Sequence, residues 1–275
     1  MPSPIAPVTL PDTERHTLVS RASGDSYVVD IALPAGEAPE GGWPAILLLD
    51  APGCFATCVE ALRRMARRGD ATGVVPMVVI GVATGGGVYD VARRQRDFTT
   101  PPPPGTPAKG GEGGAADFLG FLEGEVLALA RARVPIDPAR LTLFGHSLAG
   151  YFVLWAMLAG GGRFAHYAAI SPSVWWDRDL LFAAARAGAG SDKRLLVMLG
   201  EWEDALPPWQ AARDDAAQVI ARRAARGMVA NARELCRIVS EAGSVQAQFR
   251  LMAEEDHASI ISAAVPRALR LASGR

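Results

Sequence analysis

The sequence predicts an α/β protein: one domain over residues 1–275, with a mostly parallel, doubly wound sheet and helices on both faces. Short apolar runs such as 45–49, 77–83 and 195–199 are typical of strands buried on both faces. These runs alternate with longer segments of helical periodicity, as in a sheet with crossover helices. Polar clusters follow most of the runs, and ligands of such sheets bind at the carboxyl ends of the strands.

In chain order, residues 17–20 and 27–33 predict two antiparallel edge strands with a turn at 23–25. Residues 84–114 lack periodicity, so we expect an ordered active-site loop in the first half, a mobile second half, and a candidate lid overall. The remaining elements form one series. Strands are expected at 45–49, 77–83, 141–144, 167–170, 195–199 and 245–252, and helices at 60–68, 117–133, 151–159, 214–241 with a break near Gly227, and up to about Arg270.

Composition excludes several classes of function. The chain has 28 basic and 29 acidic residues and a net charge of −1, which argues against nucleic-acid or membrane-surface binding. We interpret its arginines as solvated helix faces. Cys54, Cys58 and Cys236 make no disulfide framework, and no second Cys/His pair accompanies Cys54 and Cys58, so neither a metal nor a cofactor is expected. No signal peptide or membrane span is visible, which predicts a cytoplasmic location.

The segment Gly145-His146-Ser147-Leu148-Ala149-Gly150 joins an apolar strand to an apolar helix. That context is the one a nucleophile elbow requires, and it makes Ser147 the candidate nucleophile of an α/β-hydrolase. Positions two before and two after the serine must be small, because the strand and helix backbones nearly touch. Gly145 meets this demand fully and Ala149 adds one methyl group.

A base and an acid should follow the nucleophile in the chain. His257, after the last strand, is the candidate base, while His146 inside the elbow is expected mainly to pack. Glu203 is the first choice of acid because its distance from Gly200 favours reaching His257. Glu201, then Asp204 and Asp256, remain open, as does a Ser–His dyad without a committed acid.

Acyl transfer also needs backbone N–H donors for the developing oxyanion. We expect one from Leu148, directly after the nucleophile, and one from Gly53 or Cys54 in the loop after the 45–49 strand. Pro52 has no N–H to give.

These residues resemble the putative-esterase α/β-hydrolases, and among them the bacterial siderophore-esterase-like branch that includes trilactone hydrolases. The resemblance spans about residues 14–272 and rests most specifically on Arg96-Asp97-Phe98-Thr99 and Ser171-Pro172-Ser173-Val174-Trp175-Trp176. It implies a serine carboxylesterase, in some members with a Ser–His dyad. It suggests that Arg96 lies near substrate, although an Arg96–Asp97 structural ion pair is the alternative. Trp175 and Trp176 would stack on an aryl group or pack in the core, and His146 joins the candidate substrate contacts.

The sequence therefore predicts a serine hydrolase that cleaves small-molecule carboxylic esters through an acyl-enzyme, with siderophore-type or aryl esters as the candidate substrates. Acyl transfer or thioester hydrolysis at the same site is one alternative. A non-catalytic ligand-binding protein on a hydrolase scaffold is another. The oligomeric state is not fixed by the sequence.

Overall fold

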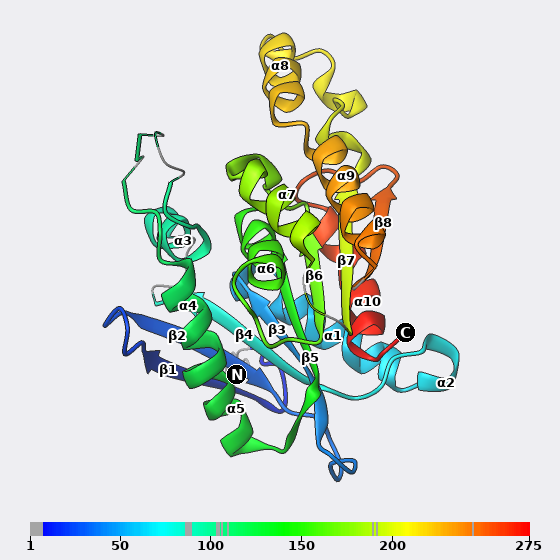
Figure 1. Ribbon diagram of the computed structural model, residues 1–275. Coiled ribbons are helices and arrows are strands. Elements are labelled where there is room, and N and C mark those ends of the chain that lie inside the picture. Colours follow the sequence, from blue (N-terminus) through cyan, green and yellow to red (C-terminus); the bar gives the residue numbers. More distant parts are fainter. Residues whose placement is uncertain are drawn as a thin grey trace, which may run out of the picture.

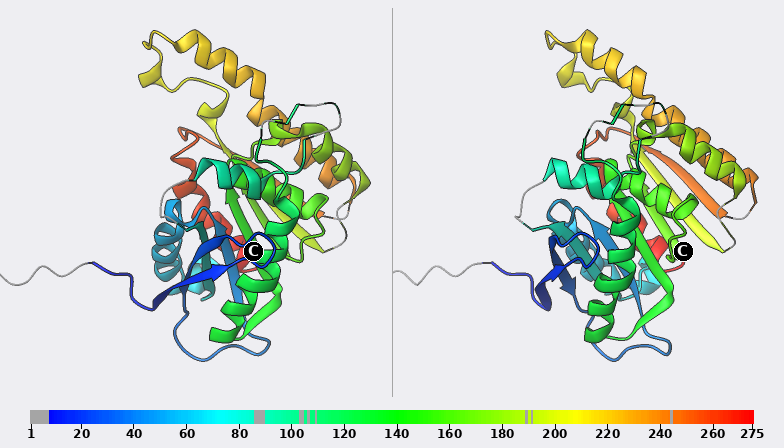
Figure 2. Two further views of the ribbon diagram at one scale, coloured as in Figure 1. Left: turned by 90° about the vertical axis from the view of Figure 1, so that its left-hand side faces the viewer. Right: turned by 60° about the vertical axis from the view of Figure 1, so that its left-hand side comes forward.

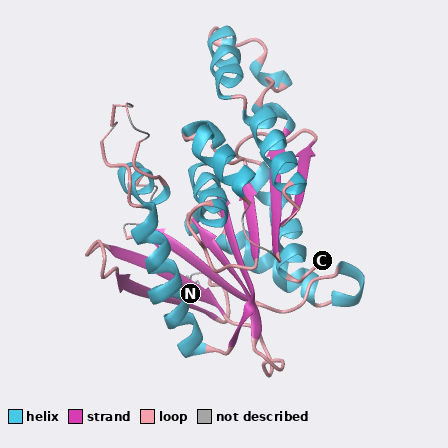
Figure 3. Cartoon of the chain, in the orientation of Figure 1, coloured by secondary structure: helices cyan, strands magenta, loops and turns pink. Residues whose placement is uncertain are grey.

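A computed structural model describes residues 8–275, apart from 86–89, 103, 104, 106, 109, 189, 191 and 244. One sheet runs through it (Figure 3). The sheet has eight strands in the order β1-β2-β4-β3-β5-β6-β7-β8. The two pairs that involve β2 are antiparallel, and the other neighbours are parallel. The strands are β1 Thr13–Val19, β2 Ser26–Ala32, β3 Trp43–Leu49, β4 Val78–Thr84, β5 Ile136–His146, β6 His166–Ile170, β7 Lys193–Gly200 and β8 Val245–Met252.

Helices cover both faces of the sheet (Figure 1). Side chains of α1 and α10 pack with one set of alternate strand residues, and those of α4 to α7 and α9 pack with the other set. The predicted α/β-hydrolase architecture is thus confirmed. The helices are α1 Phe55–Ala66, α2 Gly69–Thr72, α3 Val91–Phe98, α4 Ala115–Phe121, α5 Leu127–Arg133, α6 Leu148–Leu158, α7 Arg178–Ala187, α8 Ala216–Arg226, α9 Met228–Glu241 and α10 Ile260–Ala272.

Every predicted strand is present, and the central ones are apolar on both faces because helices cover both. The expected break near Gly227 is also present, where φ of +51° ends α8 before α9 begins. Three of the helices, α2, α3 and α7, were not expected. Asp90 caps α3 by accepting from the Arg93 N–H at 3.0 Å, and Asp177 caps α7 by accepting from the Leu180 N–H at 3.1 Å.

The candidate lid, residues 84–114, lies partly outside the described residues. Its first half was expected to be an ordered loop, and α3 occupies most of the described part of that half. Phe98 and Thr99 are buried at the end of α3, and the Gly113 and Ala115 N–H groups donate to the Thr99 carbonyl oxygen. Movement of this segment over the site stays a prediction.

Helix α8 extends away from the body of the molecule, beyond the carboxyl end of β8 (Figures 1 and 2). Only Val219 of this helix is buried, so little packing holds α8 along its length. In the described part of the chain, no helix is long and apolar enough to cross a membrane.

His166 at the start of β6 gives a prediction about stability. The side chain is buried, and burial followed by the charge of Arg194 lowers its pKa from 6.5 to about 4. Between pH 6.5 and about pH 4, His166 is therefore protonated in the unfolded chain but neutral in the folded chain. We expect the free energy of unfolding to fall by on the order of 3 kcal/mol as the pH is lowered across that range. Thermal denaturation at pH 7 and pH 4.5 should show a smaller fall in Tm for His166→Asn than for the original chain; an equal fall would contradict the assignment.

Candidate active site

The carboxyl ends of four strands carry unusual backbone geometry. Asp50, Ser147, Ser171 and Glu254 follow β3, β5, β6 and β8, and each has a positive φ, between 45° and 60°. Such angles are costly for non-glycine residues and persist only where the surroundings hold them, often at functional sites. The strained positions thus concentrate at the edge of the sheet where a site was expected.

Ser147 occupies a sharp turn between β5 and α6, with φ 59° and ψ −118°. A Cβ on Gly145 would lie 2.4 Å from the Ala149 carbonyl oxygen, so only glycine allows this approach of strand and helix. On the other side of the turn, a Cβ on Gly150 would lie 2.9 Å from the Ile170 carbonyl oxygen. Ala149 is fully buried, and its extra methyl group is accommodated. The geometry is that of a nucleophile elbow.

His257 and Glu203 complete a chain of hydrogen bonds from Ser147. The His257 Nε2 atom lies 3.0 Å from Ser147 Oγ, and its Nδ1 atom lies 2.7 Å from Glu203 Oε2. The imidazole is half exposed, whereas the Glu203 side chain is 2% exposed. A half-exposed imidazole between a hydroxyl and a buried carboxylate can take a proton from the hydroxyl and return it to a leaving group.

The Glu203 carboxylate is fully engaged. Its Oε1 atom accepts from Ser171 Oγ and, at 3.2 Å, from the Gly200 N–H. Burial alone would raise the pKa of Glu203, but the hydrogen bonds and the charge of His257 outweigh it, so the pKa lies below its usual value. The group is therefore ionised at neutral pH, which suits a residue that orients an imidazole.

The other acids considered from sequence lie elsewhere. Glu201 accepts from the Glu254 N–H at 2.9 Å, and Asp204 accepts from the Val229 N–H at 3.3 Å. Asp256 accepts from the Ala258 and Ser259 N–H groups and so shapes the loop that carries His257. Of the four candidates, the structure brings Glu203 against the imidazole.

His146 holds the backbone of the candidate base. Its Nε2 atom donates to the His257 carbonyl oxygen at 2.7 Å, and the two rings lie 4.7 Å apart. Burial, followed by the charge of His257, lowers the pKa of His146 to about 4, so His146 is neutral at physiological pH. Its contact is thus with the His257 loop, whereas the sequence placed His146 among the substrate contacts.

The loop after β3 was expected to supply an oxyanion donor. Here the Gly53 and Cys54 N–H groups donate at 3.0 Å to the Asp50 and Ala51 carbonyl oxygens, within a 3₁₀ turn. Both expected donors are therefore occupied in this structure. Leu148 differs, because it is the first residue of α6 and a first-turn N–H has no acceptor within its own helix.

The Cys54 side chain is also unsuited to act as a nucleophile. Burial raises the pKa of its thiol well above the usual range, and burial raises that of neighbouring Cys58 to about 12. Both thiols are protonated at neutral pH. Among the described residues, no group of three His, Cys, Asp or Glu is arranged to hold a metal ion.

Arg96 lies in a structural cluster rather than at the candidate site. Its guanidinium forms ion pairs with Asp25 at 2.6 Å and Asp97 at 2.7 Å, and it donates to Tyr27 Oη at 3.2 Å. Arg96 is not among the described residues that line the cavity at Ser147. The geometry therefore supports the structural ion pair, and the expectation that Arg96 contacts substrate does not fit it.

The cavity at Ser147 has a volume of about 360 Å³. Trp175 and Trp176 form part of its wall, as the aryl-stacking interpretation requires, and their rings lie 6.1 Å apart. The rest of the wall holds residues that sequence reasoning missed. The described lining consists of Ser147, Leu148, Ser173, Trp175, Trp176, Trp202, Glu203, Arg222, Arg223, Arg226, Met228 and His257.

The missed arginines all come from α8. Arginines on a helix usually face solvent, and the sequence analysis interpreted those of residues 214–241 in that way, although it expected the break near Gly227. The signal that could have revealed them is the break at Gly227 together with the spacing of Arg222 and Arg226, which places both on one face.

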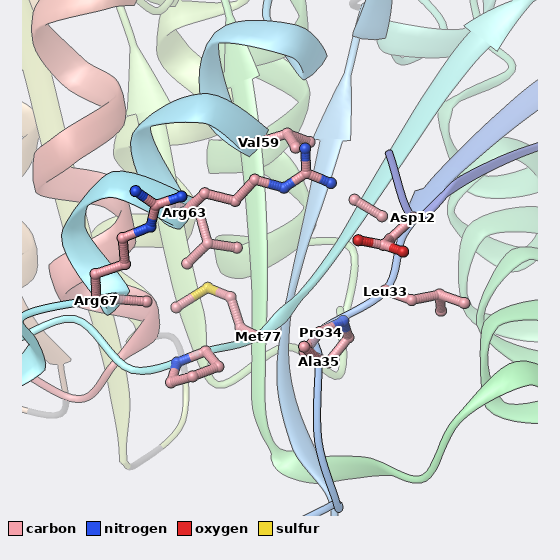
Figure 4. A pocket seen from close by; sticks show the side chains of 12 residues that line it. Asp12, Leu33, Pro34, Ala35, Val59, Arg63, Arg67 and Met77 are labelled. Carbon is pink, nitrogen blue, oxygen red and sulfur yellow. The ribbon is translucent and has the colours of Figure 1, made fainter. Parts of the chain in front are cut away.

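A second hollow, of about 340 Å³, lies between α1 and the ends of β2 and β4 (Figure 4). Its wall is mainly apolar, with Asp12, Arg63 and Arg67 as its charged residues. The described lining contains no serine, cysteine or histidine, so no hydroxyl–imidazole or thiol–imidazole pair faces this hollow. The chemistry belongs to the cavity at Ser147.

The fold and the Ser147–His257–Glu203 geometry define the class of α/β-hydrolases. The model of the putative-esterase family matches residues 20–249, and the chain belongs to that family. It is a carboxylic ester hydrolase.

Three relatives illustrate the similarity. The chain is 32% identical to ferri-bacillibactin esterase BesA of Bacillus subtilis, covering 96% of this chain and 90% of the relative. It is 33% identical to the siderophore triacetylfusarinine C esterase of Aspergillus fumigatus, covering 96% and 94%. The solved structure of siderophore hydrolase EstB from Aspergillus nidulans is 26% identical, with a TM-score of 0.85 and coverage of 98% and 97%.

The contrast between Glu203 and Glu201 gives the first prediction for the site. Glu203→Gln keeps the size of the side chain but removes the charge that orients His257, so kcat should fall on the order of 10⁴-fold with little change in KM. Glu201→Gln is the matched control and should stay within a few fold of the original. Steady-state kinetics on a p-nitrophenyl ester would decide; equal losses in both variants would remove Glu203 from the assignment.

The nucleophile elbow gives the second prediction for the site. Gly145→Ala forces a methyl group against the Ala149 carbonyl, which should cost about 1–3 kcal/mol of unfolding free energy and displace Ser147. Gly120→Ala is the control, because a Cβ there meets nothing within 4 Å and alanine favours the helix. Denaturant unfolding and esterase assays should show losses in the first variant only. A fully active Gly145→Ala enzyme would contradict the elbow geometry.

Proposed function

We propose that this chain is a serine esterase that hydrolyses siderophore-type esters through an acyl-enzyme on Ser147. The observation that carries the proposal is the pair of distances at His257, 3.0 Å to Ser147 Oγ and 2.7 Å to Glu203 Oε2. Nucleophile, base and orienting acid each come from the end of a different strand, in the chain order of this fold.

In the first half of the reaction, His257 Nε2 takes the proton of Ser147 Oγ as the oxygen attacks the ester carbonyl carbon. Glu203 keeps the proton on Nδ1 and stabilises the imidazolium that forms. The Leu148 N–H stabilises the negative oxygen of the tetrahedral intermediate. The intermediate collapses when His257 gives the proton to the leaving alkoxide oxygen, which departs as an alcohol.

In the second half, water attacks the acyl-enzyme carbonyl, and His257 takes the proton of that water. Collapse of the second tetrahedral intermediate breaks the bond to Ser147 Oγ, and His257 returns the proton to that oxygen. The products are a carboxylic acid and the restored serine. An alcohol or a thiol can attack the acyl-enzyme in place of water. Product analysis with added alcohols or thiols therefore distinguishes hydrolysis from acyl transfer.

The siderophore part of the proposal rests on the relatives, which are named for ferri-bacillibactin and triacetylfusarinine C. The tryptophan-lined cavity supports it, because flat side chains accommodate aryl groups. The three cysteines are free, which fits a reducing compartment such as the cytoplasm, and we place the enzyme there.

Two variants test the mechanism. Ser147→Ala and His257→Ala should each lower kcat for a short p-nitrophenyl ester on the order of 10⁶-fold, because removing either member disables the unit. Ser262→Ala, on the exposed face of α10, serves as the matched serine control and should be fully active. Circular dichroism should show the same fold in all three.

A covalent label makes the test independent of the substrate. A fluorophosphonate probe should modify Ser147, located by peptide mass spectrometry, and should leave Ser147→Ala unmodified. A chain that resists the probe would be a ligand-binding homologue instead. A panel of acetyl, aryl and macrolactone esters would then show whether siderophore-type esters are preferred.

A further inference from the structure

The α8 helix places a cluster of charge beside the candidate nucleophile. Arg222, Arg223 and Arg226 line the cavity that also contains Ser147 and His257. Glu203 is the one carboxylate in the described lining, and its oxygens are bound by His257, Ser171 and Gly200. The cavity is therefore strongly positive, although the whole chain has a net charge of −1.

Arg223 has a structural task. It donates to the Trp202 carbonyl oxygen at 2.8 Å, to the Ala205 carbonyl oxygen, and to Gln210 Oε1 at 3.2 Å. These bonds tie α8 to the loop that carries Glu203. The positive charge of Arg223 remains, because its acceptors are neutral, but its N–H groups are largely used.

Arg222 and Arg226 are different. They lie four residues apart and so share one face of α8, both side chains are exposed, and neither has an ion-pair partner within the described ranges. Asp215 interacts electrostatically with Arg222, but its carboxylate is already paired with Arg213 at 2.7 Å. Two guanidinium groups at a cavity wall without a carboxylate of their own are suited to an anion supplied by the ligand.

The neighbouring wall is aromatic. The Arg226 guanidinium lies 4.8 Å from the centre of the Trp175 ring, and Trp176 and Trp202 line the same cavity. Trp202 is fixed by an edge-to-face contact with Trp209 at 4.5 Å. A flat ring can therefore lie against tryptophan while an anionic substituent on that ring meets guanidinium.

We infer that Arg222 and Arg226 are specificity-determining residues that select esters carrying a negatively charged aromatic group. The inference rests on the proposed function, because it takes Ser147 as the nucleophile of the same cavity. It narrows the substrate class by charge: anionic aryl esters are favoured, and neutral esters of equal size are hydrolysed less efficiently.

Matched ester pairs test it. We would compare phenyl benzoate with phenyl 4-sulfobenzoate, and with 4-sulfophenyl benzoate, so that the charge sits on the acyl ring or on the leaving ring. For the original chain, kcat/KM should be at least about tenfold higher for one of the sulfonated esters than for the neutral one. Raising the ionic strength from about 0.02 M to about 0.5 M should reduce this ratio, because salt screens partly exposed charges.

Substitution of the arginines should remove the preference. Arg222→Ala and Arg226→Ala should each lower the ratio about fivefold, and the double variant should bring it close to one. The readout is the ratio of kcat/KM for the charged and the neutral ester, because truncating a cavity-lining arginine also changes the wall that a neutral ester meets. Circular dichroism should show that each variant is folded. Arg237→Ala is the matched control: it removes the same charge from the neighbouring helix α9, where its partners are Glu234 and Glu241, outside the cavity, and should keep the ratio.

The possible results separate the two proposals. An original chain that hydrolyses all three esters equally, or a double variant that keeps the preference, would overturn the role of the arginines and leave ester hydrolysis at Ser147 intact. Failure to hydrolyse any of the esters, together with no fluorophosphonate label, would overturn the proposed function itself.

Discussion

The buried carboxylate of Glu203 is the feature on which the arrangement of the site depends. A charge this deeply buried is tolerated only when it is bound on every side, and Glu203 accepts from Ser171, Gly200 and His257. Each of these partners comes from a different strand end, β6, β7 or β8. The carboxylate therefore joins three neighbouring strands at one edge of the sheet and positions the imidazole as a consequence.

The close approach of two backbones makes this burial attainable. A Cβ on Gly200 would lie 2.2 Å from the Glu255 carbonyl oxygen, so the loop that carries His257 passes directly over the end of β7. The Trp202 N–H donates to the same carbonyl oxygen at 3.0 Å. Glycine at this position thus has a physical reason, and it is the counterpart of Gly145 at the elbow: each absent side chain lets a loop come close enough for one hydrogen bond of the Ser147–His257–Glu203 chain.

The strands, the elbow and the chain order of nucleophile, acid and base could be predicted because each depends on local pattern. Apolar runs identify buried strands, and a small residue two positions before the serine identifies a tight turn. The choice among Glu201, Glu203 and Asp204 could only be ranked, because it depends on which residue of a short 3₁₀ turn points inward. The roles of Arg96 and His146 depend on partners distant in sequence, such as Asp25 for Arg96 and the His257 carbonyl for His146, and no periodicity indicates these.

The arginines of α8 show a different limit of sequence reasoning. The local sequence does not distinguish an arginine that faces solvent from one that lines an open cavity. The difference depends on the direction in which α8 projects from the molecule. That direction is set by Arg223, whose acceptors Trp202 and Ala205 flank Glu203 in the chain. The anchor of the helix and the orienting acid therefore share one loop.

Because of this shared loop, substitutions at Arg223 and substitutions at Arg222 or Arg226 should have different effects. A substitution at Arg223 would alter the loop around Glu203 and so the orientation of His257, which affects every substrate alike. A substitution at Arg222 or Arg226 leaves those hydrogen bonds in place and alters the charge and the cavity wall that a substrate meets. The fold thus holds the hydrolytic groups on buried strand ends and carries its selectivity on an exposed helix, where side chains can change at little cost to stability because only Val219 of that helix is buried.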